Sequence, residues 1–133
     1  MIGGLLPTDF LDHYDSLAGF FDSFVERSGG ATQVGELEAD VLSGQRQCAV
    51  VVKGDRIVAC GLSKVEVPPR LVVTHCSGEG AEEWGEGLLD YYEEWADAKC
   101  GGRLVVACRP GWVRLLDMRK RGYAETHRIM ERG

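Results

Sequence analysis

The chain has 133 residues, a formal net charge of −6, 44% hydrophobic residues and 27% charged residues. This composition is typical of one globular domain with a single core, so we expect one domain over residues 1–133. The acidic charge argues against general nucleic-acid binding, and no apolar run approaches the ~20 residues that span a bilayer. The first seven residues, Met-Ile-Gly-Gly-Leu-Leu-Pro, lack the basic and long apolar regions of a signal peptide. We therefore predict a cytoplasmic location.

The first predicted element is a long amphipathic helix that begins at Thr8 or Asp9 as its cap and ends near residue 28. Its apolar side chains recur at steps of three and four, as on one face of a helix: Phe10, Tyr14, Leu17, Phe21 and Phe24. A second, weaker helix follows, with Thr32 as its cap and Gly44 as its stop.

Residues 48–53 and 56–67 are β-prone runs on either side of the dipeptide Gly54-Asp55. Two such runs around a two-residue turn predict a β-hairpin. The dipeptide Pro68-Pro69 ends the second run, because proline cannot donate to a sheet and fixes its own backbone.

The expected turn fixes the register of this hairpin. With Gly54-Asp55 as the turn, Lys53 lies opposite Arg56 and Ala49 lies opposite Cys60. Cys48 and Cys60 then point to opposite faces of the sheet, which excludes a disulfide between them. The odd number of cysteines, without a C-x-x-C pair, also argues against a disulfide framework or a metal site. We expect thiols at all five positions: Cys48, Cys60, Cys76, Cys100 and Cys108.

The stretch around which the chain is organised begins with a short apolar run at residues 71–73. A glycine-bearing turn follows at residues 77–80, and a segment of helical period covers residues 81–98. A strand, a glycine turn and a helix N-terminus leave several backbone N–H groups without partners and aimed outward, which makes an anion cradle. Gly78 and Gly80 permit positive φ and the close approach of a ligand.

The C-terminal part begins with a continuous apolar run at residues 104–108, which predicts a buried strand. We expect this strand to lie parallel to the one at residues 71–76. A turn at residues 109–112, a short helix that ends at Gly122 and a last strand over residues 123–130 complete the chain.

Residues 75–80, His-Cys-Ser-Gly-Glu-Gly, resemble the Q/R-x-x-G-x-G/A signature of the GNAT superfamily of acetyl-CoA-dependent N-acetyltransferases, with histidine in place of Gln or Arg. The order of predicted elements is similar to the family order over about residues 8–130, without a clear first or last strand. Residues 119–123, Arg-Lys-Arg-Gly-Tyr, are similar to the family's E-K-x-G-F/Y ending. Residues 98–101 resemble a segment of short GNAT-like proteins encoded by bacteriophages.

This resemblance implies an α/β fold, with a mixed sheet truncated at its first and last strands, and acetyl-CoA as the cofactor. Coenzyme A would lie between the strands at residues 71–76 and 103–108, with its pyrophosphate on the loop amides. The implied cofactor-binding residues are Val73, His75, Cys76, Ser77, Gly78, Glu79, Gly80 and Ala81. Because Glu79, Glu82 and Glu83 stand where the pyrophosphate charge would lie, we predict that acetyl-CoA binding is weak.

The catalytic residues are left open by the sequence. Met118 stands where many family members have a tyrosine that protonates the departing thiolate, and Glu66, His75 and His127 are alternative bases. Two functions are compatible with these residues. The chain is either an N-acetyltransferase whose substrate amine attacks directly, or a non-enzymatic, phage-encoded member that binds a phage or host protein in the host cytoplasm or the virion. The oligomeric state is not predicted.

Overall fold

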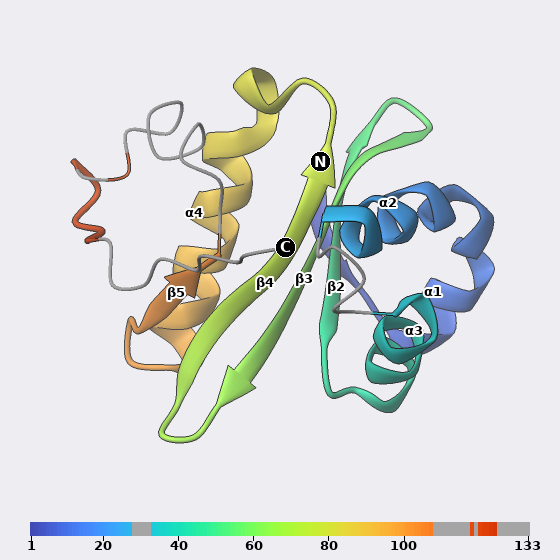
Figure 1. The fold of residues 1–133 in the computed structure, drawn as a ribbon. Helices are drawn as coiled ribbons and strands as arrows, with labels where there is room; N and C mark the ends of the chain where they lie inside the picture. Colours follow the sequence, from blue (N-terminus) through green and yellow to red (C-terminus); the bar gives the residue numbers. More distant parts are fainter. Residues whose placement is uncertain (28–32, 108–117, 119, 125–133) are drawn as a thin grey trace, which may run out of the picture.

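The computed structural model describes residues 1–27, 33–107, 118 and 120–124, and within them five strands form one sheet that four helices cover (Figure 1). The strand order is β1-β2-β3-β4-β5, in which only β4 and β5 are parallel neighbours. The expected mixed α/β sheet is confirmed. The elements in chain order are β1 (Ile2–Leu5), α1 (Pro7–Asp12), α2 (Tyr14–Arg27), α3 (Val34–Ser43), β2 (Gln47–Lys53), β3 (Arg56–Glu66), β4 (Arg70–Gly78), α4 (Ala81–Lys99) and β5 (Leu104–Val106).

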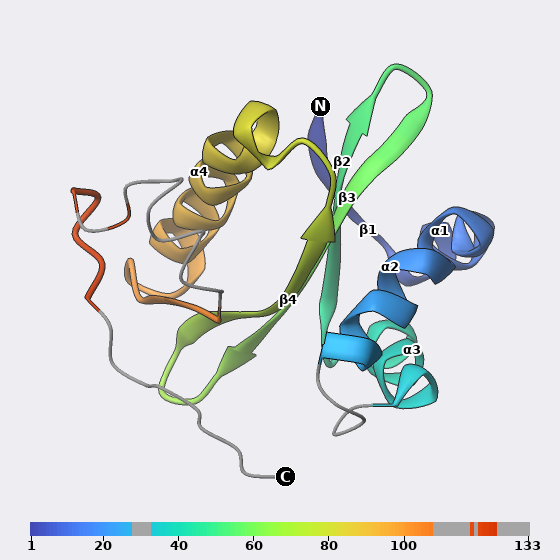
Figure 2. The same ribbon diagram turned by 45° about the horizontal axis from the view of Figure 1, so that its top comes forward.

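Helices α1, α2 and α3 lie against one face of the sheet and α4 lies against the other, as Figure 1 and Figure 2 show. Two apolar cores result, because successive side chains of a strand point to opposite faces. The core under α1, α2 and α3 is built from Phe10, Leu17, Phe21, Phe24, Leu37, Val41, Cys48, Val50, Cys60 and Leu62. The core under α4 is built from Ala49, Val51, Ala59, Leu71, Val73, Trp84, Leu88, Tyr92, Ala96 and Cys100.

The first predicted helix is in fact two helices, α1 and α2, which are separated at His13. The predicted cap at Thr8 or Asp9 is wrong, since Leu6 is the N-cap residue and no side chain caps α1. Pro7 explains the difference: its fixed φ suits the first helical position, so the helix starts before Thr8. The predicted apolar stripe is confirmed at four of its positions, which are buried: Phe10, Leu17, Phe21 and Phe24.

The second predicted helix is confirmed as α3, and it ends where expected. Gly44 adopts the left-handed conformation (φ 82°) and donates its N–H to the carbonyl of Val41, as in many helix C-termini. The predicted cap, Thr32, lies outside the described residues.

A first strand is present, contrary to the expected truncation at this end of the sheet. β1 pairs antiparallel with β2, with Ile2 opposite Val51. The sequence did not predict this strand because two of its four residues, Gly3 and Gly4, are glycines, which are depleted in strands. Close packing explains the glycine at position 4, because a Cβ atom there would lie 3.1 Å from the hydroxyl oxygen of Tyr91.

The hairpin of β2 and β3 turns at Gly54-Asp55 as predicted, but its register is shifted. A bulge between Val51 and Val52 moves the pairing by one residue, so Ala49 lies opposite Gly61 and not opposite Cys60. A shift of one residue moves every later side chain to the other face. The prediction that Cys48 and Cys60 point to opposite faces is therefore wrong: both lie in the core under α1, α2 and α3.

Strand β4 is longer than the sequence indicated, since it continues to Gly78 and leaves only Glu79 and Gly80 as the turn. Gly78 is needed for its contact with β3. A Cβ atom there would lie 2.5 Å from the Cβ of Ala59 and 2.6 Å from the carbonyl oxygen of Val58. The predicted parallel pairing with β5 is confirmed over residues 71–73 and 104–106.

The described part of the C-terminal segment is held against α4. Met118 is buried in a small cluster with Leu89. The Arg121 Nη1 atom lies 3.1 Å from Glu93 Oε2, and the Tyr123 hydroxyl donates to the same carboxylate at 2.9 Å. Other predictions lie wholly or mostly outside the described residues: Cys108, the turn at 109–112, the short helix before Gly122 and the strand at 123–130.

Candidate functional site

The candidate site begins where β4 extends beyond β5. Among the described residues, the last bond on this side of β4 joins the Ala107 N–H, just after β5, to the Val73 carbonyl at 2.9 Å. From there β4 continues to Gly78, and within the described residues it pairs with β3 alone. Figure 1 shows β5 beside only the first part of β4. The last part of β4 therefore has one edge that no described strand covers.

Two residues of β4 direct their backbone groups to this open edge. The Glu79 N–H donates to the Val58 carbonyl at 3.2 Å, so it faces β3. Because successive residues alternate in direction, the backbone groups of Cys76 and Gly78 face away from β3. The Cys76 carbonyl accordingly accepts a hydrogen bond from Arg27 Nη1 of α2, at 3.0 Å.

The open edge leads directly into the N-terminus of α4. Gly80 is the N-cap residue in the left-handed conformation (φ 75°, ψ 36°), and no side chain caps the helix. Among the described residues, the N–H groups of Gly80, Ala81 and Glu82 have no backbone acceptor. The Trp84 indole N–H donates to the Glu79 carbonyl at 2.6 Å and holds the turn against the helix. Such a helix start can accept an anion.

The charges around this helix start are mainly negative. Glu82 and Glu83 lie in the first turn of α4, three and four residues after Glu79. Lys53, at the end of β2, lies with its Nζ 2.8 Å from Glu83 Oε2, although both side chains are largely exposed (70% and 62%). An exposed ion pair contributes little to stability. It does place one cation beside the turn, which the sequence pattern did not indicate.

On the face of β4 that packs against α2, a bulge brings two polar side chains together. His75 lies opposite Leu62 while Val73 lies opposite Ser63, so Thr74 is an extra residue in β4. Bulges of this kind re-aim side chains and are frequent beside active sites. Here the bulge places Thr74 next to His75, with the His75 Nδ1 atom 2.9 Å from the Thr74 Oγ1 atom.

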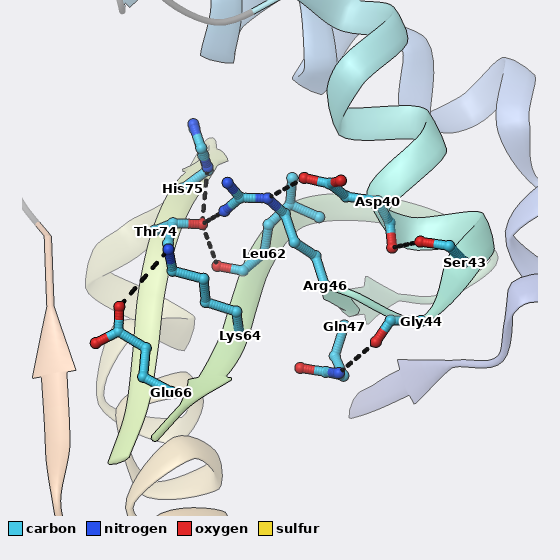
Figure 3. Close-up of polar contacts among 10 residues, drawn as sticks. All are labelled: Asp40, Ser43, Gly44, Arg46, Gln47, Leu62, Lys64, Glu66, Thr74 and His75. Atoms are coloured by element: carbon cyan, nitrogen blue, oxygen red, sulfur yellow. Dashed lines mark hydrogen bonds and ion pairs between the residues drawn. The ribbon is translucent and has the colours of Figure 1, made fainter. Parts of the chain in front are cut away.

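These two residues end a chain of polar contacts that starts on α3, as Figure 3 shows. The Arg46 Nε atom donates to Asp40 Oδ2 at 2.9 Å, and its Nη1 atom donates to Thr74 Oγ1 at 2.6 Å. The Thr74 hydroxyl also lies 3.3 Å from the Leu62 carbonyl oxygen. The contacts thus join α3, the segment just before β2, strand β3 and the bulge of β4.

The imidazole of His75 is partly buried against α2. Its ring centroid lies 5.3 Å from that of Phe24, at an interplanar angle of 50°. Burial, together with the positive charge of Arg46, lowers the pKa of His75 to about 4. The side chain is therefore neutral at pH 7, and each ring nitrogen can have only one role, as donor or as acceptor.

The predicted cofactor-binding residues all lie along β4, its turn and the start of α4, but their side chains point to different faces. Val73 and Cys76 belong to the α4 side of the sheet, and Val73 is fully in the core. His75 and Ser77 face α2, where the buried Ser77 hydroxyl donates to Ser23 Oγ at 3.3 Å. The side chains of this stretch therefore do not form one site, and only its backbone groups lie together along the open edge of β4.

The alternative catalytic residues differ in their surroundings. Glu66 accepts a hydrogen bond from Arg70 Nε at 2.7 Å, which lowers the pKa of this carboxyl, and it precedes β4 at the end remote from the glycine turn. Met118 is buried and has no hydroxyl to donate a proton. His127 lies outside the described residues. His75 is the one of the three predicted bases that the structure places beside the open edge.

Three side chains of this region had no signal in the sequence: Arg27, Asp40 and Arg46. They come from α2, α3 and the segment before β2, and only the packing of these helices on the sheet brings them to β4. In the described part of the chain, no three His, Cys, Asp or Glu side chains are placed to hold a metal. None of the described helices is long and apolar enough to cross a membrane.

Comparison of the structure with solved structures shows the same fold in acetyltransferases. A probable acetyltransferase superposes with a TM-score of 0.72 and 14% identity, over 100% of this chain and 95% of the other. An aminoglycoside acetyltransferase from an uncultured soil metagenomic sample, solved with sisomicin, gives 0.65 and 16%, over 100% and 94%.

A predicted acetyltransferase from Clostridium acetobutylicum, solved with acetyl-CoA, gives a TM-score of 0.65 and 10% identity over 100% of this chain and 95% of the other. Neither a protein-family model nor a curated protein matches the sequence. At identities this low the likeness shows the fold alone, and the fold is that of the GNAT acetyltransferases.

Proposed function

We propose that this chain binds acetyl-CoA along the open edge of β4 and transfers the acetyl group to an amine. One observation carries the proposal: β4 extends beyond β5 and leads into an uncapped helix start. An extended edge whose backbone N–H groups point away from β3, followed by a helix N-terminus, suits a ligand that has an amide-containing arm and a phosphate group. The acetyltransferase structures of the same fold support this assignment.

The backbone supplies the binding groups. The N–H groups of Cys76 and Gly78 face the open edge and can donate to the arm of the cofactor or to its thioester carbonyl. The N–H groups of Gly80, Ala81 and Glu82 can donate to the pyrophosphate, together with the dipole of α4. The Val73 carbonyl is already used by Ala107, so the cofactor arm has to engage β4 beyond this point.

When bound, acetyl-CoA supplies an acetyl group activated as a thioester, and an amine that takes this group forms an N–C bond, replaces the C–S bond and loses one proton to the sulfur or to solvent. The chain has to orient the amine and exclude competing water. Direct attack needs no covalent intermediate on the protein, which agrees with the buried and structural surroundings of Cys48, Cys60 and Cys100.

A second function is a non-enzymatic member of the fold that binds a phage or host protein in the host cytoplasm or in the virion. Two observations favour it. Met118 cannot protonate a departing thiolate. Glu79 and Glu82 place negative charge where a pyrophosphate would bind, and neither is a partner of Lys53. We treat this as the alternative that the same experiments decide.

The test has two stages. Isothermal titration calorimetry with acetyl-CoA measures binding to the full chain, and free-thiol release is then followed with amines present. Sisomicin and a peptide with an N-terminal alanine serve as first acceptors, because one acetyltransferase of this fold was solved with sisomicin and another is a ribosomal-protein-alanine N-acetyltransferase. Binding followed by amine-dependent thiol release supports the transferase. Absence of binding at millimolar acetyl-CoA overturns it and favours the protein-binding alternative.

A further inference from the structure

The contacts of the Thr74 hydroxyl determine which nitrogen of His75 carries the hydrogen. Thr74 Oγ1 has three neighbours: Arg46 Nη1 at 2.6 Å, His75 Nδ1 at 2.9 Å and the Leu62 carbonyl oxygen at 3.3 Å. The guanidinium can only donate and the carbonyl can only accept. The single hydroxyl hydrogen therefore goes to Leu62. All three contacts are hydrogen bonds only if Nδ1 also donates, so the assignment is the Nδ1–H tautomer.

We propose that His75 is held in this tautomer and that its bare Nε2 atom accepts a hydrogen bond from the N–H of the acceptor amine. The inference rests on the acetyl transfer proposed above, and it names the residue that orients the nucleophile. Thr74, Arg46 and Asp40 act through His75 as positioning residues, in the same way that a base is oriented by a third group in other enzymes.

The position of His75 suits this role. It lies two residues beyond Val73, where the pairing of β4 with β5 ends, so its side chain stands beside the open edge. Figure 3 shows the other ring nitrogen, Nε2, pointing away from the Thr74 contact. Within the described residues Nε2 has no hydrogen-bond donor, and the ring is partly exposed. Contact with Phe24 restricts rotation of the ring.

The neutral state of the ring sets what His75 can do. Because its pKa is lowered to about 4, it stays an acceptor through the physiological range and does not repel a cationic amine. The same low pKa makes it too weak to remove a proton from a free alkylammonium ion. We therefore assign it the orientation of the attacking amine, and the proton is lost by another route.

Nitrogen-15 NMR of histidine-labelled protein reads the tautomer without any turnover. The expected spectrum has a protonated Nδ1 and an unprotonated Nε2 for His75 between pH 6 and 8, with the signals assigned by their loss in His75→Gln. Thr74→Val, which removes the hydroxyl at nearly constant volume, should allow the Nε2–H tautomer to appear, and Thr74→Ser should not. An Nε2–H tautomer in the unmodified protein overturns the inference.

Kinetics test the role. His75→Ala should lower kcat/KM for the amine by about 10-fold, the worth of one hydrogen bond, while the Kd for acetyl-CoA is unchanged. His75→Gln, which offers an acceptor oxygen near the Nε2 position, should restore most of the loss. His13→Ala, at the exposed junction of α1 and α2, is the matched control.

The outcomes separate the two proposals. Unchanged turnover in His75→Ala, with the Nδ1–H tautomer confirmed, overturns the role of His75 and leaves the transferase intact. A protein that binds acetyl-CoA but acetylates no amine overturns the transferase and this inference with it, and the NMR result then still reports the tautomer.

Discussion

The sulfur atoms of Cys48 and Cys60 lie 3.6 Å apart, on adjacent strands and inside the core under α1, α2 and α3. Both residues are about 1% exposed. The hydrogen bond with Cys48, together with burial, raises the pKa of Cys60 well above its ordinary value. Because the thiolate is the reactive species and oxidants need access, neither sulfur is poised to react, although the two are neighbours.

We predict that both thiols remain reduced in the native protein. Treatment with diamide under native conditions should leave the Cys48 and Cys60 peptides uncrosslinked in a mass spectrum. The same treatment in concentrated urea should link them, because unfolding exposes both sulfurs. A Cys48–Cys60 disulfide formed without urea would contradict this prediction.

Replacement of Gly78 tests whether this glycine serves the sheet. In Gly78→Ala the new methyl group meets the Ala59 Cβ at 2.5 Å and the Val58 carbonyl at 2.6 Å. We expect a loss of about 1–3 kcal/mol in the free energy of unfolding, measured with urea. Ala59→Gly in the same chain should recover only part, since the Val58 carbonyl remains.

The matched control for Gly78 is Gly35→Ala in the exposed part of α3, where a Cβ would meet no atom within 4 Å. Helix propensity predicts a gain of about 0.5–1 kcal/mol there. Equal effects of the two substitutions would show that the close approach to β3 is not what requires glycine at position 78.

Acidic side chains should limit acetyl-CoA affinity. Two like charges ~6 Å apart repel by roughly 3 kcal/mol at an effective dielectric near 20, before screening by salt. Glu79→Arg combined with Glu82→Gln should therefore tighten acetyl-CoA binding by about 10-fold in calorimetry at low salt. Lys53→Ala should weaken binding, since it frees the charge of Glu83.

Glu94→Gln is the control for these charge changes. It removes one exposed carboxylate from the same helix, about 18 Å beyond Glu82 at 1.5 Å per residue. Its acetyl-CoA affinity should equal that of the unmodified chain. Tight acetyl-CoA binding by the unmodified protein would refute the charge argument and strengthen the transferase assignment.

The lowered pKa of His75 predicts a specific dependence of stability on pH. The ordinary pKa is 6.5 and the folded value is about 4, so between these values the unfolded chain binds a proton that the folded chain does not. Stability therefore falls as the pH is lowered from 6.5 to 4, and because solvent screens this partly exposed ring the fall from this group is reduced to about 1–2 kcal/mol. Above pH 6.5 the group has no effect.

The measurement is the difference in unfolding free energy between the unmodified protein and His75→Gln across this range. The difference should change by the stated amount, because carboxylates titrate alike in both. His13→Gln, at the exposed junction of α1 and α2, is the control substitution. A pH-independent difference for His75→Gln would mean that its pKa is not lowered by folding.

The sequence alone determined most of the architecture. Apolar steps of three and four predicted the buried stripe of α1 and α2, and the dipeptide Gly54-Asp55 predicted the hairpin turn. The apolar runs at residues 71–73 and 104–108 predicted the parallel neighbours β4 and β5, which pair over residues 71–73 and 104–106. These signals are local, because the helix period, the turn residues and the apolar strand runs each depend on only a few neighbouring residues of the chain.

Only the tertiary structure decided the register, the first strand and the side chains around the site. The bulges at Val51/Val52 and at Thr74 each add one residue, which no alternation pattern marks, yet each reverses the faces of the later residues in its strand. Arg46, which donates to Asp40 of α3, reaches Thr74 because α3 packs on the sheet, and Arg46 and Thr74 are 28 residues apart in sequence. Long-range contacts of this kind depend on packing geometry, and packing geometry is not a property of any local pattern.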